Sequence, residues 1–314
     1  MSSAMLVENK LHHEYWRKAV KPTIAVTGAT EQAGYEFVNC IDENGGTAFK
    51  VSGGQAVITI TFDSQKLLNG FAIFGHNLKF NQGIQVKFST ALTGDFFDFK
   101  ATNAAEIGVY NSEPVYNPSD NSYKAFGCAF KQTFFLVRRL QITTVGWDSE
   151  SYISILSAGL WVNQGIDISA PFVPPMFAPQ ETVMKRNNKG NPLLSDVRAM
   201  PQKLKINMTQ FSEDDLLLQI DNYKQVGSGL LDYTKSTING ETKNFPLVEL
   251  VGHYVSRYPF FLMYMQGTDG ETDAQIKADR DKIYYCTVDK SLKQPSYSSP
   301  TLLNWSINAI GYIS

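Results

Sequence analysis

The sequence has few of the residues and none of the motifs that most catalytic and metal sites require. Its 314 residues include four histidines and three cysteines, and no His-x-x-x-His, Cys-x-x-Cys, G-x-S-x-G or G-x-G-x-x-G pattern occurs. Cys40, Cys128 and Cys286 are odd in number and far apart, which argues against a disulfide framework and a zinc site. A carboxylate pair of the glycosidase kind can form from distant positions without a local signature. We predict a protein that is not an enzyme and that needs no metal or cofactor.

Long apolar runs and an excess of one charge are also absent. No apolar stretch approaches the ~20 residues of a membrane-spanning helix, and residues 1–16 lack the uninterrupted apolar core of a signal peptide. Lys and Arg number 28 against 30 Asp and Glu, a net charge of −2, and no basic run offers a nucleic-acid surface. We therefore expect folding in a reducing cytoplasm, no membrane insertion and no nucleic-acid partner.

Aromatic and β-branched residues, which favour strands, are abundant. Aromatics make up 12% of the chain, with 20 Phe and 15 Tyr. Val57–Phe62 and Ile84–Phe88 alternate apolar and polar residues, and the apolar run Gly70–Phe74 lies between them. Asn69-Gly70 predicts a tight hairpin at the start of that middle run. These patterns predict a mainly β fold with half-buried antiparallel strands.

Composition divides the chain into four segments. They are a polar N-terminal arm (1–23), a first β domain (24–165), a proline-rich connector (166–203) and a second β domain (204–314). Six prolines fall between positions 171 and 201, so the connector cannot be regular structure over its whole length.

Two of these segments carry apolar residues that predict contacts with a neighbour. The arm is expected to be solvated, with Trp16 docking it onto a sheet or onto another subunit. The connector is too apolar for a free linker, so it is expected to pack along a domain or a neighbouring copy. The predicted assembly contacts are Trp16, Phe172, Met176 and Phe177.

The strongest helix signal of the chain covers residues 212–226. Ser212 opens a capping-box pattern, and three acidic residues follow it in the first turn. Leu216, Ile220 and Tyr223 recur at the spacing of one helical stripe. We predict one helix there, flanking the second β domain.

The strands of residues 20–165 resemble the discoidin or galactose-binding-like β-sandwich. The resemblance is carried by Val57–Phe62, Gly70-Phe71-Ala72-Ile73, a strand ending at Ser89 before Gly94-Asp95, the run Phe134–Ile142 and the closing run Ile153–Val162. Arg138 or Arg139 stands at the arginine position of that family's strand, and Phe49 stands where the family has a tryptophan. The resemblance implies an N-terminal jelly-roll sandwich.

The second domain is similar to tail and baseplate proteins of tailed bacteriophages. Its order is strand, helix, aromatic strand after Tyr258-Pro259, strand and terminal strand. The runs IDENGGTAF (41–49) and FAIFGHNL (71–78) also resemble phage virion proteins. The resemblance implies a tail-tube-like β-sandwich or barrel-like C-terminal domain. It also implies synthesis in the host cytoplasm, a place in the virion tail, and partners among copies of itself and neighbouring tail proteins.

Two functions stay open: an oligomeric virion protein, and a monomeric lectin-like or fibre-adaptor module that binds host surface glycan. In the second, aromatic faces stack on sugar rings while Asn and Asp side chains hydrogen-bond hydroxyls. The predicted binding-loop residues are Asp42, His76, Asn77, Tyr116, Asn117, Asp120, Arg138 and Trp147. Structural alternatives are open for three of them, with Asp42 capping a turn instead of holding calcium, His76 structural, and Trp147 capping a strand.

Overall fold

The computed structural model describes residues 3–79, 82–98, 109–111, 116–117, 122–123, 126–130, 135–162, 180–186, 192–199, 202–212, 217–220, 243–246, 254–264, 283–289, 292–293, 296–299 and 302–312. The strands are β1 (Ser3–Asn9), β2 (Thr23–Thr27), β3 (Phe49–Lys50), β4 (Val57–Leu68), β5 (Gly70–His76), β6 (Gly83–Ser89), β7 (Phe97–Asp98), β8 (Val109–Asn111), β9 (Tyr116–Asn117), β10 (Ser122–Tyr123), β11 (Phe126–Phe130), β12 (Phe135–Val145), β13 (Tyr152–Val162), β14 (Gln180–Arg186), β15 (Pro192–Ala199), β16 (Gln202–Ser212), β17 (Leu217–Ile220), β18 (Lys243–Pro246), β19 (Phe260–Tyr264), β20 (Ile283–Val288), β21 (Ser296–Ser299) and β22 (Leu302–Tyr312). The helical segments are α1 (Lys10–His12), a π-helical turn (His13–Arg17) and a 3₁₀ turn (Phe37–Cys40). Within these residues no helix is long and apolar enough to cross a membrane.

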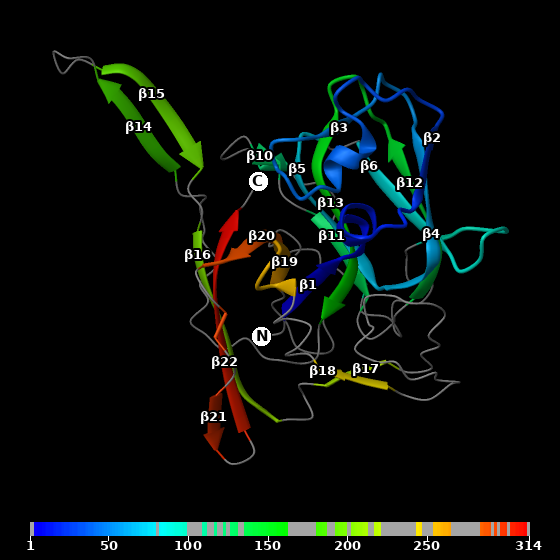
Figure 1. Ribbon diagram of the computed structural model, residues 1–314. Helices are drawn as coiled ribbons and strands as arrows, with labels where there is room; N and C mark the ends of the chain where they lie inside the picture. Colours follow the sequence, from blue (N-terminus) through cyan, green and yellow to red (C-terminus); the bar gives the residue numbers. More distant parts are fainter. Residues whose placement is uncertain are drawn as a thin grey trace.

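Two antiparallel sheets form the N-terminal sandwich, which confirms the mainly β prediction (Figure 1). One sheet has five strands in the order β2-β4-β12-β6-β7. The other sheet has 11 strands and includes β13, β5, β11 and β8, with β3 paired to β13. Alternation places the core between them, because every second residue of β4 is buried through Ile58, Ile60 and Phe62.

The predicted hairpin at Asn69-Gly70 is wrong. Leu68 of β4 pairs with Phe135 in the five-stranded sheet, whereas Gly70 of β5 pairs with Gly159 in the other sheet. The Asn69 backbone N–H donates to the Gly159 carbonyl at 3.0 Å. Asn69 therefore carries the chain from one sheet to the other. The hydrophobic faces of β4 and β5 are buried by packing across the sandwich. The pairing of each strand with a distant partner in its own sheet therefore overrides the local turn signal.

The N-terminal residues were expected to form a solvated arm, but they lie inside the larger sheet. Strand β1 pairs with β13 on one side and with β19 on the other, both antiparallel (Figure 1). The larger sheet continues from β19 through β20 and β22 to β16, so the sandwich and the C-terminal strands share it. Gly159 allows this approach, because a Cβ there would lie 1.7 Å from the Glu8 carbonyl oxygen.

Buried ion pairs hold the N-terminal segment against the five-stranded sheet and stabilise it internally. Lys66 of β4 has a fully buried side chain, and its Nζ lies 2.9 Å from Glu14 Oε2 and 2.7 Å from Asp63 Oδ1. The Lys10 ammonium lies 2.6 Å from Glu8 Oε1, and both side chains are buried. The charges that made this segment look solvated are therefore paired inside the protein, Glu8 with Lys10 and Glu14 with Lys66 of β4.

The helix predicted over 212–226 is wrong where the structure describes it. Ser212 ends strand β16, and Leu217–Ile220 forms β17, which pairs with Lys243–Pro246 of β18. A short apolar run fits a strand as well as a helical stripe, so cross-strand pairing decides between them. Residues 213–216 and 221–226 lie outside the described residues.

The connector also contains regular structure, since β14 and β15 form an antiparallel hairpin. Pro192 opens β15, a position where a strand tolerates proline.

Candidate functional site

Four loops meet at one end of the sandwich. Gln32 joins three of them, because its Nε2 donates to the carbonyls of Val51 at 2.9 Å and Ser149 at 2.7 Å. The fourth loop follows β5 and joins them through Asn77 and Lys79. We call this region the end-loop site and define it by Tyr35, Lys50, Asn77, Lys79, Asp148 and Tyr152.

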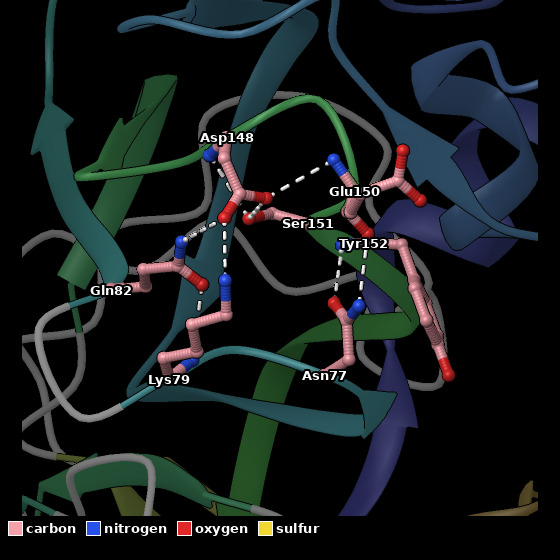
Figure 2. Close-up of polar contacts among 7 residues, drawn as sticks. All are labelled: Asn77, Lys79, Gln82, Asp148, Glu150, Ser151 and Tyr152. Carbon is pink, nitrogen blue, oxygen red and sulfur yellow. Dashed lines mark hydrogen bonds and ion pairs between the residues drawn. The ribbon is translucent and has the colours of Figure 1, made fainter.

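Asp148 organises the polar half of the site (Figure 2). Its Oδ2 accepts from Lys79 Nζ at 2.8 Å and from Gln82 Nε2 at 3.1 Å. Its Oδ1 accepts from Ser151 Oγ at 2.8 Å and from the Glu150 backbone N–H at 3.1 Å. The hydrogen bond from Lys79 and that from Ser151 hold the pKa of the Asp148 carboxyl well below its usual range. Asp148 thus stays ionised and fixes the loops, which does not suit a general acid.

Asn77 ties the loop after β5 to the start of β13. Its Oδ1 accepts from the Tyr152 backbone N–H at 2.8 Å, and its Nδ2 donates to the Glu150 carbonyl at 2.9 Å (Figure 2). Both ends of the Asn77 amide are therefore bonded to the protein backbone. Of the predicted loop residues, Asn77 is the one that belongs to this site, where it positions Tyr152.

A lysine between two tyrosines forms the other half of the site. Lys50 of β3 pairs with Tyr152 of β13, and the Lys50 backbone N–H donates to the Tyr35 carbonyl at 3.0 Å. Lys50 Nζ lies 4.5 Å from the ring centroid of Tyr35 and 5.5 Å from that of Tyr152. Tyr35 is 39% exposed, whereas Tyr152 and Lys50 are half-buried. This arrangement offers a ligand aromatic surface beside a cation.

Two of the predicted residues have structural positions instead. Trp147 is only 4% exposed, its Nε1 donates to the Gly83 carbonyl at 2.8 Å, and its ring packs on Phe49. Its ring face is therefore not available for stacking on a sugar, because the sandwich core takes it up. His76 is buried at the end of β5, where its Nδ1 accepts from the Leu78 backbone N–H at 3.2 Å.

The two arginines of β12 differ in their surroundings. Arg139 donates from Nε to the Ala91 carbonyl at 2.9 Å and from Nη2 to the Gly94 carbonyl at 2.8 Å. Its guanidinium also lies over the Phe96 ring, 4.4 Å from the centroid. Arg139 therefore orders the loop after β6. Arg138 is half-buried opposite the irregular stretch of β4.

Asp42 closes a turn. Its Oδ1 accepts from the Asn44 backbone N–H at 2.7 Å, and the Thr47 hydroxyl lies 3.0 Å from both of its carboxylate oxygens. This is an Asx-type turn, as the capping alternative describes. Across the described part of the chain, no three His, Cys, Asp or Glu side chains gather closely enough to hold a metal ion.

The remaining predicted residues are not part of the end-loop site or fall outside the described residues. Tyr116 and Asn117 form β9, which pairs only with β10 among the described strands. Trp16 is 43% exposed, and its ring meets Tyr15 edge-on. Asp120, Phe172, Met176 and Phe177 fall outside the described residues.

Sequence reasoning missed five of the six residues of the end-loop site. Tyr35, Lys50, Lys79, Asp148 and Tyr152 form no local motif, and strand register and loop hydrogen bonds bring them together. The acidic turn before β13, in which Asp148 accepts from Glu150 and Ser151, is the one signal that could have pointed to the site.

Comparison with known proteins assigns no family. No family model matches the sequence, and no curated protein is similar to it.

Similar solved structures include a pectin-binding carbohydrate-binding module, with 13% identity, a TM-score of 0.30 and coverage of 44% of this chain and 89% of that one. The CBM32-1 and CBM32-2 domains of Clostridium perfringens ZmpB, in complex with GalNAc, have 13% identity, a TM-score of 0.29 and coverage of 44% and 34%. A Ruminococcus gnavus GH29 fucosidase in complex with fucose has 14% identity and a TM-score of 0.30, with 44% of this chain covering 25% of that chain. This chain therefore spans about a quarter of the fucosidase's length. At these identities and TM-scores the likeness assigns neither a family nor a ligand to this chain.

Proposed function

We propose that the N-terminal sandwich is a glycan-binding module whose ligand lies on the end-loop site. The observation that carries the proposal is the position of Lys50 beside the exposed ring of Tyr35 and the ring of Tyr152. Sugars present apolar C–H faces that pack on aromatic rings and hydroxyls that accept hydrogen bonds from cations. Both kinds of contact are available there within one small area.

The hydrogen bonds beneath the site support this proposal. Asn77 and Asp148 hold the surrounding loops through bonds to the backbone and to Lys79. Loops that are ordered before the ligand arrives lose less conformational entropy on binding. The same bonds engage the Asp148 carboxylate, so we propose recognition of the glycan without chemistry on it.

A glycan array followed by titration calorimetry on the full chain tests the proposal. We expect the Tyr35→Ala variant to bind at least about tenfold more weakly than the unaltered chain. Tyr297→Ala is the matched control, because Tyr297 is an exposed tyrosine of β21, at 63% exposure. Equal loss in both variants, or no glycan binding by the unaltered chain, would overturn the proposal.

We propose a structural role in a virion tail as a second function, on the basis of the hairpin β14–β15. In Figure 1 the hairpin extends away from the other strands, and in the described residues each of its strands pairs only with the other. Two strands with open outer edges are suited to pairing with a neighbouring chain. This fits one of the two alternatives predicted for the connector, packing along a neighbouring copy and not along a domain of its own chain.

Native mass spectrometry with negative-stain imaging tests the second function. We expect a closed ring from the unaltered chain, and monomers once residues 180–199 are replaced by a short Gly-Ser linker. Monomers at all concentrations of the unaltered chain would count against self-assembly in solution. They would leave the glycan proposal untouched, because the end-loop site lies within one chain.

A further inference from the structure

The end-loop site contains two lysines with different electrostatic surroundings. Lys79 is neutralised, since its Nζ lies 2.8 Å from Asp148 Oδ2. Among the ion pairs that the described residues form, none involves Lys50. The ammonium of Lys50 instead faces the rings of Tyr35 and Tyr152. Lys50 therefore carries the one positive charge of this site that no carboxylate offsets.

The carboxylates of the neighbouring loops are hydrogen-bonded to groups other than Lys50 or are exposed. Glu31 Oε1 accepts from the Phe37 backbone N–H at 2.7 Å. Glu36 accepts from the Gly34 backbone N–H at 3.1 Å and from Asn39 Nδ2 at 3.3 Å. Glu150, which follows Asp148 in the same turn, is exposed. An anionic group that enters the site is thus attracted by Lys50 and repelled at the Glu150 side, which defines its orientation.

We infer that the ligand of the end-loop site is an acidic glycan, whose sugar carboxylate pairs with Lys50 while its ring lies against Tyr35. This inference rests on the proposed glycan-binding function and names its ligand class. Aromatic rings position the Lys50 ammonium without neutralising it, so its charge remains available to a ligand. A charge-assisted hydrogen bond is stronger than one to a neutral hydroxyl, and it separates acidic from neutral sugars.

The test uses two ligands that differ only in the carboxylate. A galacturonic acid hexamer is compared with the same hexamer after its carboxyl groups have been reduced to alcohols. Calorimetry on the full chain is expected to give about tenfold tighter binding of the acidic hexamer at low salt. That preference should shrink at 0.5 M NaCl, where charges on the surface are screened.

Variants assign the preference to Lys50. Lys50→Met is expected to bind both hexamers equally, and Lys50→Arg to keep the preference for the acidic one. The matched control is Lys205→Met, which removes an exposed lysine of β16. Thermal unfolding of each variant verifies that the sandwich is folded, and the Arg variant separates a lost charge from a lost fold.

The outcomes distinguish the inference from the function on which it rests. Equal binding of both hexamers by the unaltered chain, with loss in Tyr35→Ala, overturns the acidic preference and keeps glycan binding. An acidic preference that survives in Lys50→Met also overturns the inference. If the unaltered chain binds neither hexamer and no glycan of an array, the proposed function fails as well.

Discussion

A buried carboxyl at the junction of the sandwich with the C-terminal strands makes stability depend on pH. The Glu43 side chain is 7% exposed, and its Oε2 lies 3.7 Å from Nε2 of His12. The Tyr285 hydroxyl of β20 donates to the Glu43 carbonyl at 3.2 Å. Burial raises the pKa of Glu43 to about 8, against smaller opposing effects of the Asn9 side chain and the Arg17 charge. Burial also lowers the pKa of His12, although its Nδ1 lies 3.2 Å from the Ile41 carbonyl oxygen.

The sign of the effect follows from proton binding. Between its ordinary pKa of 4.5 and its folded pKa of about 8, Glu43 binds more protons in the folded state than in the unfolded state. Its contribution to stability is therefore fully present below pH 4.5 and is lost as pH rises through 8, by about 1.4 kcal/mol per pH unit and at most about 5 kcal/mol. His12 acts in the opposite direction and only below its ordinary pKa of 6.5, because its folded pKa is lowered. Above pH 6.5, only Glu43 contributes within this pair.

We expect the free energy of unfolding to fall by about 2 kcal/mol between pH 6.5 and pH 8, and that fall to disappear in Glu43→Gln. Urea titrations at several pH values measure it. Gln keeps the side-chain shape at this position, whose φ of 63° is unusual for a residue other than glycine, so the comparison isolates the charge. Glu150→Gln, at an exposed carboxyl, is the control. An equal fall in Glu43→Gln and the unaltered chain would refute the reasoning.

Three further substitutions test the packing that supports the site. Gly159→Ala forces β1 away from β13, because the new Cβ would meet the Glu8 carbonyl. Thermal unfolding should show a loss of about 3 kcal/mol in the free energy of unfolding, and an unchanged melting temperature would contradict this expectation. Lys66→Met leaves the buried Glu14 carboxylate with Lys18, at 3.5 Å, as its remaining ion-pair partner among the described residues, and urea titration should show a loss of about 3 to 5 kcal/mol in the free energy of unfolding. A loss below about 1 kcal/mol would mean that the ion pairs are dispensable. Arg139→Ala removes two hydrogen bonds to the loop after β6, so hydrogen exchange there should quicken while the core of β4 stays protected; equal exchange would exclude its ordering role.

Strand positions could be predicted from the sequence, but sheet membership could not. The alternating run Val57–Phe62 and the run Ile84–Phe88 lie in β4 and β6, as expected. Asn69-Gly70 carries a strong local turn signal, yet Leu68 and Gly70 find partners 67 and 89 residues away, at Phe135 and Gly159. Such pairing depends on the whole sandwich, and no window of sequence contains it.

The charged N-terminal residues show a second limit. Glu8, Lys10 and Glu14 look like a solvated surface because each is charged, and their burial depends on partners that composition does not reveal. Lys66, one of those partners, lies in a polar stretch of β4 far along the chain. A charge pattern alone therefore predicts solvation unless the partner is already known.

The candidate site illustrates the same limit for function. Trp147 was a reasonable choice for stacking, since aromatic residues in loops often bind sugars, but core packing takes up its ring. The exposed ring belongs to Tyr35, which the alternation of strands does not mark. Register between β3 and β13 brings Lys50 to Tyr152, and that register is fixed only in the folded sheet.

Strand β1 joins the sandwich that carries the end-loop site to the C-terminal strands. It pairs with β13 of the sandwich and with β19 of the C-terminal strands, so a hydrogen-bonded ladder joins them where a flexible linker would otherwise stand. A lectin module that acts alone gains nothing from such a ladder, because its ligand can approach in any orientation. A protein fixed in an assembly does gain, since the ladder sets the direction in which the end-loop site faces. The proposed glycan recognition by Tyr35 and Lys50 and the proposed self-assembly through the hairpin β14–β15 are therefore compatible in one chain, in which β1 joins the sandwich to the C-terminal strands.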